Sequence, residues 1–124
     1  MNAKTIAKDV AAYLGTALWS STGDDERPLD ATYGVYDFAP EALIDAANDI
    51  ARFRHLAGDV YDLAQEYTGY DDARFMHDLW LTQNGHGAGF WDGDYGPYGD
   101  ALTRAAKVGE SGIYVGDDGK LYLS

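Results

Sequence analysis

Apolar side chains recur at helical spacing along two long stretches of the chain. In Thr5–Trp19 they fall every three or four positions, which predicts a helix of about four turns. A second, longer stripe begins after Pro40, stays in phase to about Glu66 and has Tyr67 as its last member. Pro40 suits the first turn of a helix and Glu41 suits the positive end of its dipole. Gly58 is expected to loosen this helix or divide it in two.

Shorter segments surround these two stripes. The region from 22 to 40 carries Gly and Pro throughout and predicts a long loop, with a short extended piece at Tyr33–Tyr36. Asp71 or Asp72 is expected to cap a short helix that ends near Asp78, and Tyr98–Val108 suits a further helix.

The hydrophobic period then changes towards that of strands. Two hairpins are predicted, each with a turn rich in Gly, Asn or Asp. The first pairs Leu79–Thr82 with Ala88–Trp91 across Asn84–Gly87, and the second pairs Ile113–Val115 with Leu121–Leu123 across Gly116–Gly119. Together these elements predict a single α+β domain over residues 1–124, with three to four helices packed on a small antiparallel sheet built from two C-terminal hairpins.

Composition supports a folded domain. The chain has 124 residues, 46% of them hydrophobic, and includes ten Tyr and three Trp as bulky core groups. Because it has no Cys, disulfides, thiolate metal sites and cysteine nucleophiles are excluded. No apolar run reaches the ~20 residues that span a bilayer, so we expect a cytoplasmic protein without membrane contact.

Charge is the strongest functional signal in the composition. The chain carries 21 Asp and Glu against 9 Lys and Arg, a formal net charge of -12. A surface this acidic repels phosphate backbones, which argues against nucleic acid as a partner, and it is attracted to basic protein surfaces. A nucleic-acid-binding protein is therefore an expected partner.

The long central stripe carries a row of carboxylates. Glu41, Asp45 and Asp49 lie four residues apart, on the side that we expect to face away from the apolar stripe, at an axial spacing of ~6 Å. This row presents negative charge much as a nucleic-acid strand does, and a solvated helix face is the plain alternative. Further candidates for partner binding continue the row or supply aromatic anchors: Asp59, Asp62, Glu66, Tyr36 and Tyr70.

Other chemistry is less well supported. The segment Asn84–Asp94 holds four glycines and His86, but it matches neither a phosphate-binding loop nor a dinucleotide fingerprint. Counted from Asp92, the spacing fails the calcium-binding EF-hand pattern, and the three His show no zinc-ligand spacing. We therefore expect no catalytic residue, no metal and no cofactor.

The chain resembles a family of small acidic proteins from bacteriophages and mobile elements, mostly of unassigned function. The central match is His77-Asp78-x-Trp80-Leu81-Thr82-x-Asn84-Gly85-His86-Gly87-Ala88-Gly89-Phe90-Trp91-Asp92. Shorter matches are Ala17–Ser21, Pro28–Asp30 with Tyr33, Ala39–Glu41, Leu102-Thr103 and Gly116–Gly119 with Tyr122. At positions 79 and 83 this chain has Leu and Gln, where the family more often has an aromatic residue and an arginine. The resemblance implies an anti-defence role and transfers no catalytic residues.

Three functional hypotheses follow. The leading one is a non-enzymatic inhibitor that mimics DNA and binds the basic nucleic-acid-binding surface of a host defence protein, such as a CRISPR effector or a restriction enzyme. The alternative is a small enzyme or ligand-binding domain that uses His86, Asn84 and Asp92. A third is a structural or assembly protein with apolar, salt-insensitive contacts. The sequence leaves a homodimer open.

Overall fold

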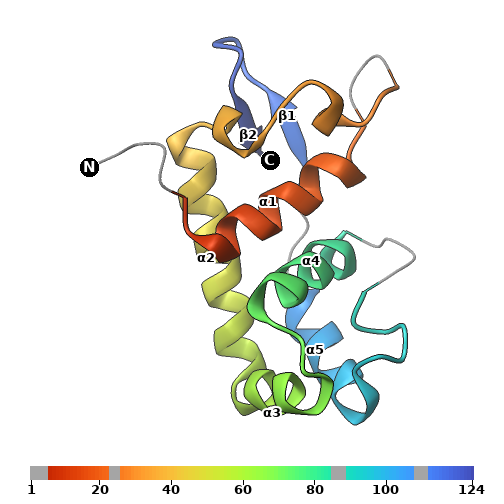
Figure 1. Ribbon diagram of the computed structural model, residues 1–124. Helices are drawn as coiled ribbons and strands as arrows, with labels where there is room; N and C mark the ends of the chain where they lie inside the picture. The colour runs from red at the N-terminus through yellow and green to blue at the C-terminus, as the bar shows by residue number, and fades with distance from the viewer. Residues whose placement is uncertain (1–5, 23–25, 85–88, 108–111) are drawn as a thin grey trace.

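The computed structural model describes residues 6–22, 26–84, 89–107 and 112–124 of the chain. Within these ranges the fold is mostly helical, with a small two-stranded antiparallel sheet, which agrees with the α+β class (Figure 1). The described residues form five α-helices, where three to four were expected. The helices are α1 (Lys8–Ser20), α2 (Pro40–Ala57), α3 (Asp59–Thr68), α4 (Asp72–Gln83) and α5 (Gly99–Ala106), with short 3-10 helices η1 (Leu29–Ala31), η2 (Val35–Asp37) and η3 (Gly96–Tyr98). The strands are β1 (Ile113–Val115) and β2 (Leu121–Leu123).

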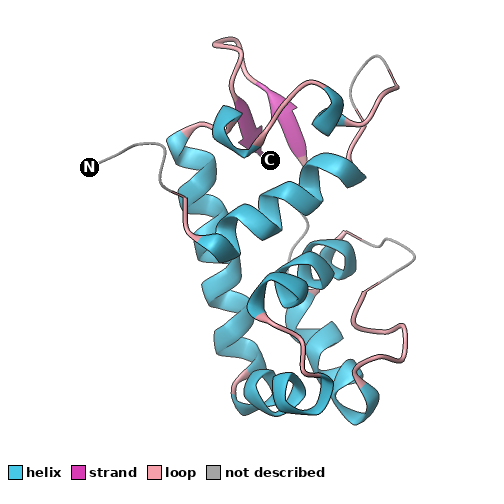
Figure 2. Ribbon diagram, in the orientation of Figure 1, coloured by secondary structure: helices cyan, strands magenta, loops and turns pink. Residues whose placement is uncertain are grey.

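Helix α2 runs most of the length of the molecule and joins its two ends. The β hairpin lies at one end of α2, and α3 crosses the other end (Figures 1 and 2). On one side of α2, α1 packs against α4, where the rings of Tyr13 and Trp80 meet edge to face with centroids 5.2 Å apart. Both side chains are almost fully buried, so this contact forms a central part of the core.

An aromatic cluster fills the core between α2, α3, α4 and the segment before α5. Phe53, Phe75, Phe90 and Tyr95 are all buried and stack or tilt against one another with ring centroids 5.0 to 6.0 Å apart. Fully burying one such ring contributes roughly 1.5 to 3 kcal/mol. Tyr61 of α3 packs on Phe53 and Phe75 with ring centroids 6.0 and 4.8 Å apart, so the cluster fixes α3 and α4 relative to α2.

Local sequence signals set several element boundaries as expected. Pro40 begins α2, and Gly58 ends it with φ 55° and ψ -135°, a conformation that favours glycine. Asp71 is the N-cap of α4, and its side chain accepts a hydrogen bond from the backbone N–H of Arg74 at 3.0 Å. The C-terminal hairpin is also confirmed, with Tyr114 opposite Tyr122.

The first predicted hairpin is wrong. The segment expected to be its first strand, Leu79–Thr82, belongs to α4, which continues to Gln83. Residues 79 to 83 are all buried, including the polar Thr82 and Gln83, so this turn of helix has no exposed side to mark a helical period. The described part of the second expected strand, Gly89–Trp91, forms a turn, and residues 85–88 of the expected tetrad lie outside the described ranges.

Where the chain folds back after α4, a hydrogen bond to a side chain takes the place of the expected pairing between strands. The backbone N–H of Phe90 donates to Thr82 Oγ1 at 2.9 Å. A Cβ atom at Gly89 would lie 2.3 Å from the same oxygen, so only glycine allows this close approach. The extended piece expected at Tyr33–Tyr36 is likewise replaced, because residues 35 to 37 form η2.

Candidate functional site: the acidic faces of α2 and α3

The acidic row of α2 does not lie on one exposed face. Glu41 and Asp45 are exposed, whereas only 15% of the Asp49 side chain is accessible. Asp49 lies 3.1 Å from the buried Tyr13 hydroxyl and 3.0 Å from Arg52. Each step of four residues turns the position by about 40° around a helix of 3.6 residues per turn. After two steps the row has therefore moved from solvent to the edge of the core.

The acidic row of α3 stays on the outside. The buried residues of α3 are Tyr61 and Ala64, and Asp59, Asp62 and Glu66 are exposed on the other side of the helix. Spacings of three and four residues alternate here, so the three positions stay within about 60° of one another. None of the three forms an ion pair within the described parts of the chain.

Three arginines neutralise carboxylates elsewhere in the molecule. Arg52 pairs with Asp49 on α2. Arg54 pairs with Asp9 of α1 at 3.0 Å and lies 3.7 Å from Asp72 of α4. Arg74 pairs with Asp78 at 3.1 Å and with Asp94 at 3.5 Å. No ion pair between described residues involves the acids on the outer face of α3, Glu41 or Asp45, and other exposed acids such as Asp30 and Asp100 are likewise outside these pairs.

The inner side of α3 is held by a polar network around Asp72. The Tyr61 hydroxyl and Gln65 Nε2 donate to Asp72 Oδ1 at 2.7 and 2.8 Å, and the Arg54 guanidinium lies over the Tyr61 ring. Burial and the hydrogen bond to Asp72 raise the pKa of Tyr61 well above its usual range. These contacts fix the rotation of α3, and with it the direction of its acids.

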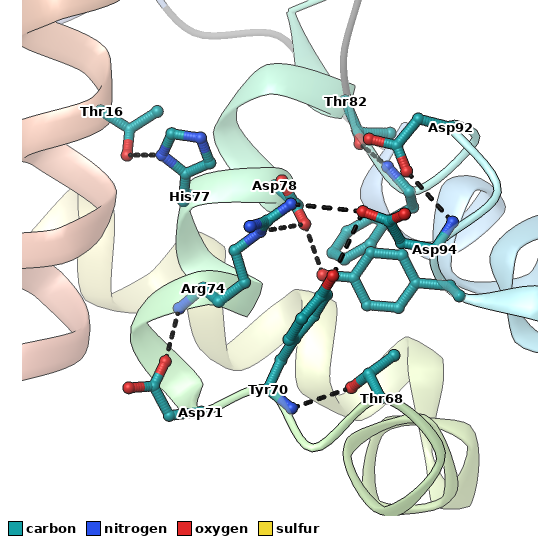
Figure 3. A network of polar contacts seen from close by, with 12 residues as sticks. Thr16, Thr68, Tyr70, Asp71, Arg74, His77, Asp78, Thr82, Asp92 and Asp94 are labelled. Carbon is teal, nitrogen blue, oxygen red and sulfur yellow. Dashed lines mark hydrogen bonds and ion pairs between the residues drawn. The ribbon is translucent and has the colours of Figure 1, made fainter.

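The two predicted aromatic anchors differ in their surroundings. Tyr36 is 66% exposed on η2. Tyr70 is half-buried and belongs to a polar cluster at the surface, in which its hydroxyl donates to Asp94 at 3.2 Å and Arg74 stacks on its ring at 4.7 Å (Figure 3). Burial and the Asp94 carboxylate raise the pKa of Tyr70.

Two hydrophobic residues beside the α3 acids were not among the sequence candidates. Tyr67 was expected on the apolar stripe, yet it is 58% exposed, and Leu63 is 46% exposed. They follow Asp59 by eight and four residues and therefore lie next to the acidic row. The combination of exposed carboxylates and exposed apolar side chains suits recognition of another protein.

The polar cluster of Figure 3 is centred on a buried carboxylate. Asp78 is 1% exposed and accepts hydrogen bonds from the Tyr95 hydroxyl and from Arg74 Nε. Burial and this carboxylate raise the pKa of Tyr95. Because Asp78 and Tyr95 are closed off from solvent and satisfied by each other, the cluster ties α4 to the segment before α5.

In the glycine-rich segment Asn84–Asp94, the described residues form no catalytic or ligand-binding cluster. His86 lies outside them, Asn84 donates to the backbone carbonyl of Trp80 at 3.0 Å, and Asp92 accepts from the backbone N–H of Asp94 at 3.3 Å. His77 Nδ1 lies 3.1 Å from Thr16 Oγ1 (Figure 3). In residues 6–22, 26–84, 89–107 and 112–124, no three His, Cys, Asp or Glu side chains are grouped to hold a metal ion.

Comparisons with known proteins add no relative. No protein-family model matches the chain, and no significant match was found among curated proteins or solved structures. None of the helices in the described ranges has the length and apolar character needed to cross a bilayer.

Proposed function

We propose that this chain is a non-enzymatic acidic inhibitor that occupies the basic nucleic-acid-binding surface of a host defence protein. The binding face consists of Asp59, Asp62 and Glu66 of α3, and Glu41 and Asp45 of α2 form a separate acidic patch outside it. The observation that carries the proposal is the outward-facing, unpaired acidic row of α3 in a protein of net charge -12.

The geometry of the α3 row supports mimicry of a phosphate backbone. Along the helix axis, Asp59 and Asp62 are separated by ~4.5 Å and Asp62 and Glu66 by ~6 Å. Phosphates of one DNA strand succeed one another every ~3.4 Å along the duplex axis, which is the same order. A basic channel that binds phosphates would therefore meet carboxylates at usable spacing, in fast and salt-sensitive association.

The position of the row favours a rigid decoy over a flexible acidic tail. The acids lie on a helix that is fixed from within by Tyr61 and Gln65 through Asp72. Asp59 and Asp62 also occupy the first turn of α3, where the helix dipole stabilises negative charge. A fixed array loses less conformational entropy on binding than a disordered one. The resemblance to small acidic phage proteins is the reason for proposing a CRISPR effector or a restriction enzyme as the target.

A displacement assay tests this function. Fluorescent duplex DNA is bound to a nuclease-inactive CRISPR effector or restriction enzyme, and the chain is titrated into the complex while anisotropy is recorded. We expect displacement that weakens steeply as salt rises from about 50 to 200 mM. The chain should show no affinity for the free duplex. A panel of such enzymes in which DNA is never displaced at low salt would contradict the proposal.

A further inference from the structure

An apolar groove lies between the α2–α3 junction and α5. Its volume is about 300 Å³, and it is lined by Leu56, Ala57, Val60, Ala101, Arg104 and Ala105. Alanines on the α5 side keep the groove open, since they have no side chain beyond Cβ. Leu56 at its edge is 49% exposed, although a large aliphatic side chain gains from burial.

The apolar lining continues along α3 beyond the groove. Val60, Leu63 and Tyr67 are spaced by three and four residues and form one stripe on the helix. Leu63 and Tyr67 are 46% and 58% exposed. Tyr67 also marks the far end of the stripe, where its ring meets Tyr98 of η3 edge to face at 5.7 Å. The stripe runs beside the acidic row along the ten residues of α3.

The charged groups that flank this apolar surface are mostly negative. Asp59, Asp62 and Glu66 are exposed on α3, and Asp100 is exposed on α5. Arg104 is the cation of the groove lining. An occupant must therefore combine an apolar face with an excess of positive charge.

We propose that the groove and the α3 stripe bind a basic amphipathic helix of the target protein. This inference rests on the proposed function and adds the kind of element that the target presents. Apolar residues of that helix at positions i, i+3, i+4 and i+7 fill the space along Leu56, Val60 and Leu63. Its Lys and Arg residues contact the α3 carboxylates, which remain at the solvated rim of the interface.

Charge complementarity selects this occupant over two others. A second copy of the chain would bring another net charge of -12 against the same acids. Anionic lipid would be repelled for the same reason. A basic helix satisfies both the apolar lining and the carboxylates.

The test uses a defined probe and two matched variants. The probe is a synthetic Leu/Lys peptide of about 18 residues with Leu at helical spacing, and a scrambled peptide of the same composition is its control. Leu63→Asp and Ile44→Asp each add one carboxylate at an exposed apolar position, since Ile44 is 62% exposed on α2. Binding is followed by amide shifts in NMR spectra, which also report whether each variant is folded.

Of the two variants, only Leu63→Asp should weaken binding. A carboxylate in the apolar stripe is desolvated by the peptide, so Leu63→Asp should weaken binding about tenfold or more. Ile44→Asp only adds negative charge and should leave affinity equal or slightly higher. Shifts should concentrate on α3 and α5, and the scrambled peptide should bind at least tenfold more weakly.

Three results would overturn the inference. If Leu63→Asp binds the peptide as tightly as wild type, association is electrostatic and the groove is not the site. Equal binding of the scrambled peptide, or shifts spread over all acidic surfaces, leads to the same conclusion. Should the Leu63→Asp variant be unfolded, Leu56→Asp replaces it with the same expectation.

The outcomes also separate this inference from the proposed function. Suppose that the protein displaces DNA from its target and that only reversal of the α3 charges abolishes this displacement. The proposed function then stands, and the inference about the groove is contradicted. A chain that neither displaces DNA nor binds the peptide contradicts both.

Discussion

Helices α2 and α3 carry similar numbers of carboxylates, yet only α3 presents them together to solvent. On α2 the constant spacing of four residues turns the row around the helix, until Asp49 reaches Tyr13 and Arg52. On α3 the alternating spacing keeps Asp59, Asp62 and Glu66 on the outer side. The difference shows that an acidic helix is a candidate binding surface only where the spacing of its acids keeps all of them on the exposed side of the helix. Acids that drift towards the core become structural.

The largest expected effect concerns the residue that separates the two helices. Gly58 has φ 55°, which other residues rarely adopt, so Gly58→Ala should destabilise the fold by about 1 to 3 kcal/mol. Gly15→Ala is the control, because Gly15 lies inside α1 with open space around it and should stabilise by about 0.5 to 1 kcal/mol. Urea unfolding measures both. Equal effects would show that the turn between α2 and α3 needs no glycine.

The next effect compares one acid from each helix. Asp49→Ala removes the contacts to Tyr13 and Arg52 and should cost about 1 to 2 kcal/mol of unfolding free energy. Glu66 is exposed and forms no ion pair with the described residues, so Glu66→Ala should change stability by less than about 0.5 kcal/mol. Urea midpoints at neutral pH measure this pair. Similar losses for both variants would remove the distinction between a structural and a free acid.

A smaller effect concerns the inner side of α3 and depends on pH. The pKa of Tyr61 is raised in the folded state by burial and by Asp72, relative to its ordinary value of 10.0. Its contribution to stability is therefore complete below pH 10 and is lost as pH rises above 10, where the unfolded chain releases the proton. Tyr61→Phe should make stability fall less steeply above pH 10, by up to about 1 kcal/mol per pH unit. Unfolding curves between pH 9 and 11 that are parallel for both proteins would contradict this.

The smallest effect concerns the exposed turn of the hairpin, beside the first turn of α2. The Tyr122 hydroxyl donates to Asp118 at 2.7 Å, and this bond lowers the pKa of the Asp118 carboxyl. Tyr122→Phe should return that pKa towards its ordinary value, as followed by NMR titration of the carboxyl carbon. An unchanged midpoint would show that the backbone N–H of Lys120 alone accounts for the shift.

Features set by neighbouring residues could be predicted from the sequence. The start of α2 at Pro40, the cap at Asp71 and the turn at Gly116–Gly119 depend on local backbone preferences. The division at Gly58 is one of the two outcomes that the sequence predicts there. Each of these signals acts within a few residues, so no knowledge of the tertiary structure was needed.

Features set by distant residues could not be predicted in this way. The end of α4 was read as a strand because residues 79 to 83 are buried on every side. The inward position of Asp49 depends on Tyr13, which lies 36 residues away in the sequence. Tyr67 appeared to continue an apolar stripe, although the packing of Tyr61 and Ala64 turns that side of α3 towards solvent.

One comparison of two triple variants tests the central claim most directly. Asp59, Asp62 and Glu66 are replaced by Lys in the first, and Asp30, Glu41 and Asp45 in the second, so that the net charge changes equally. Displacement of DNA from the target is then measured for both at low salt. If the α3 face is the binding site, the first variant loses displacement and the second retains most of it. Equal losses would show that overall charge, and not the outer face of α3, is responsible.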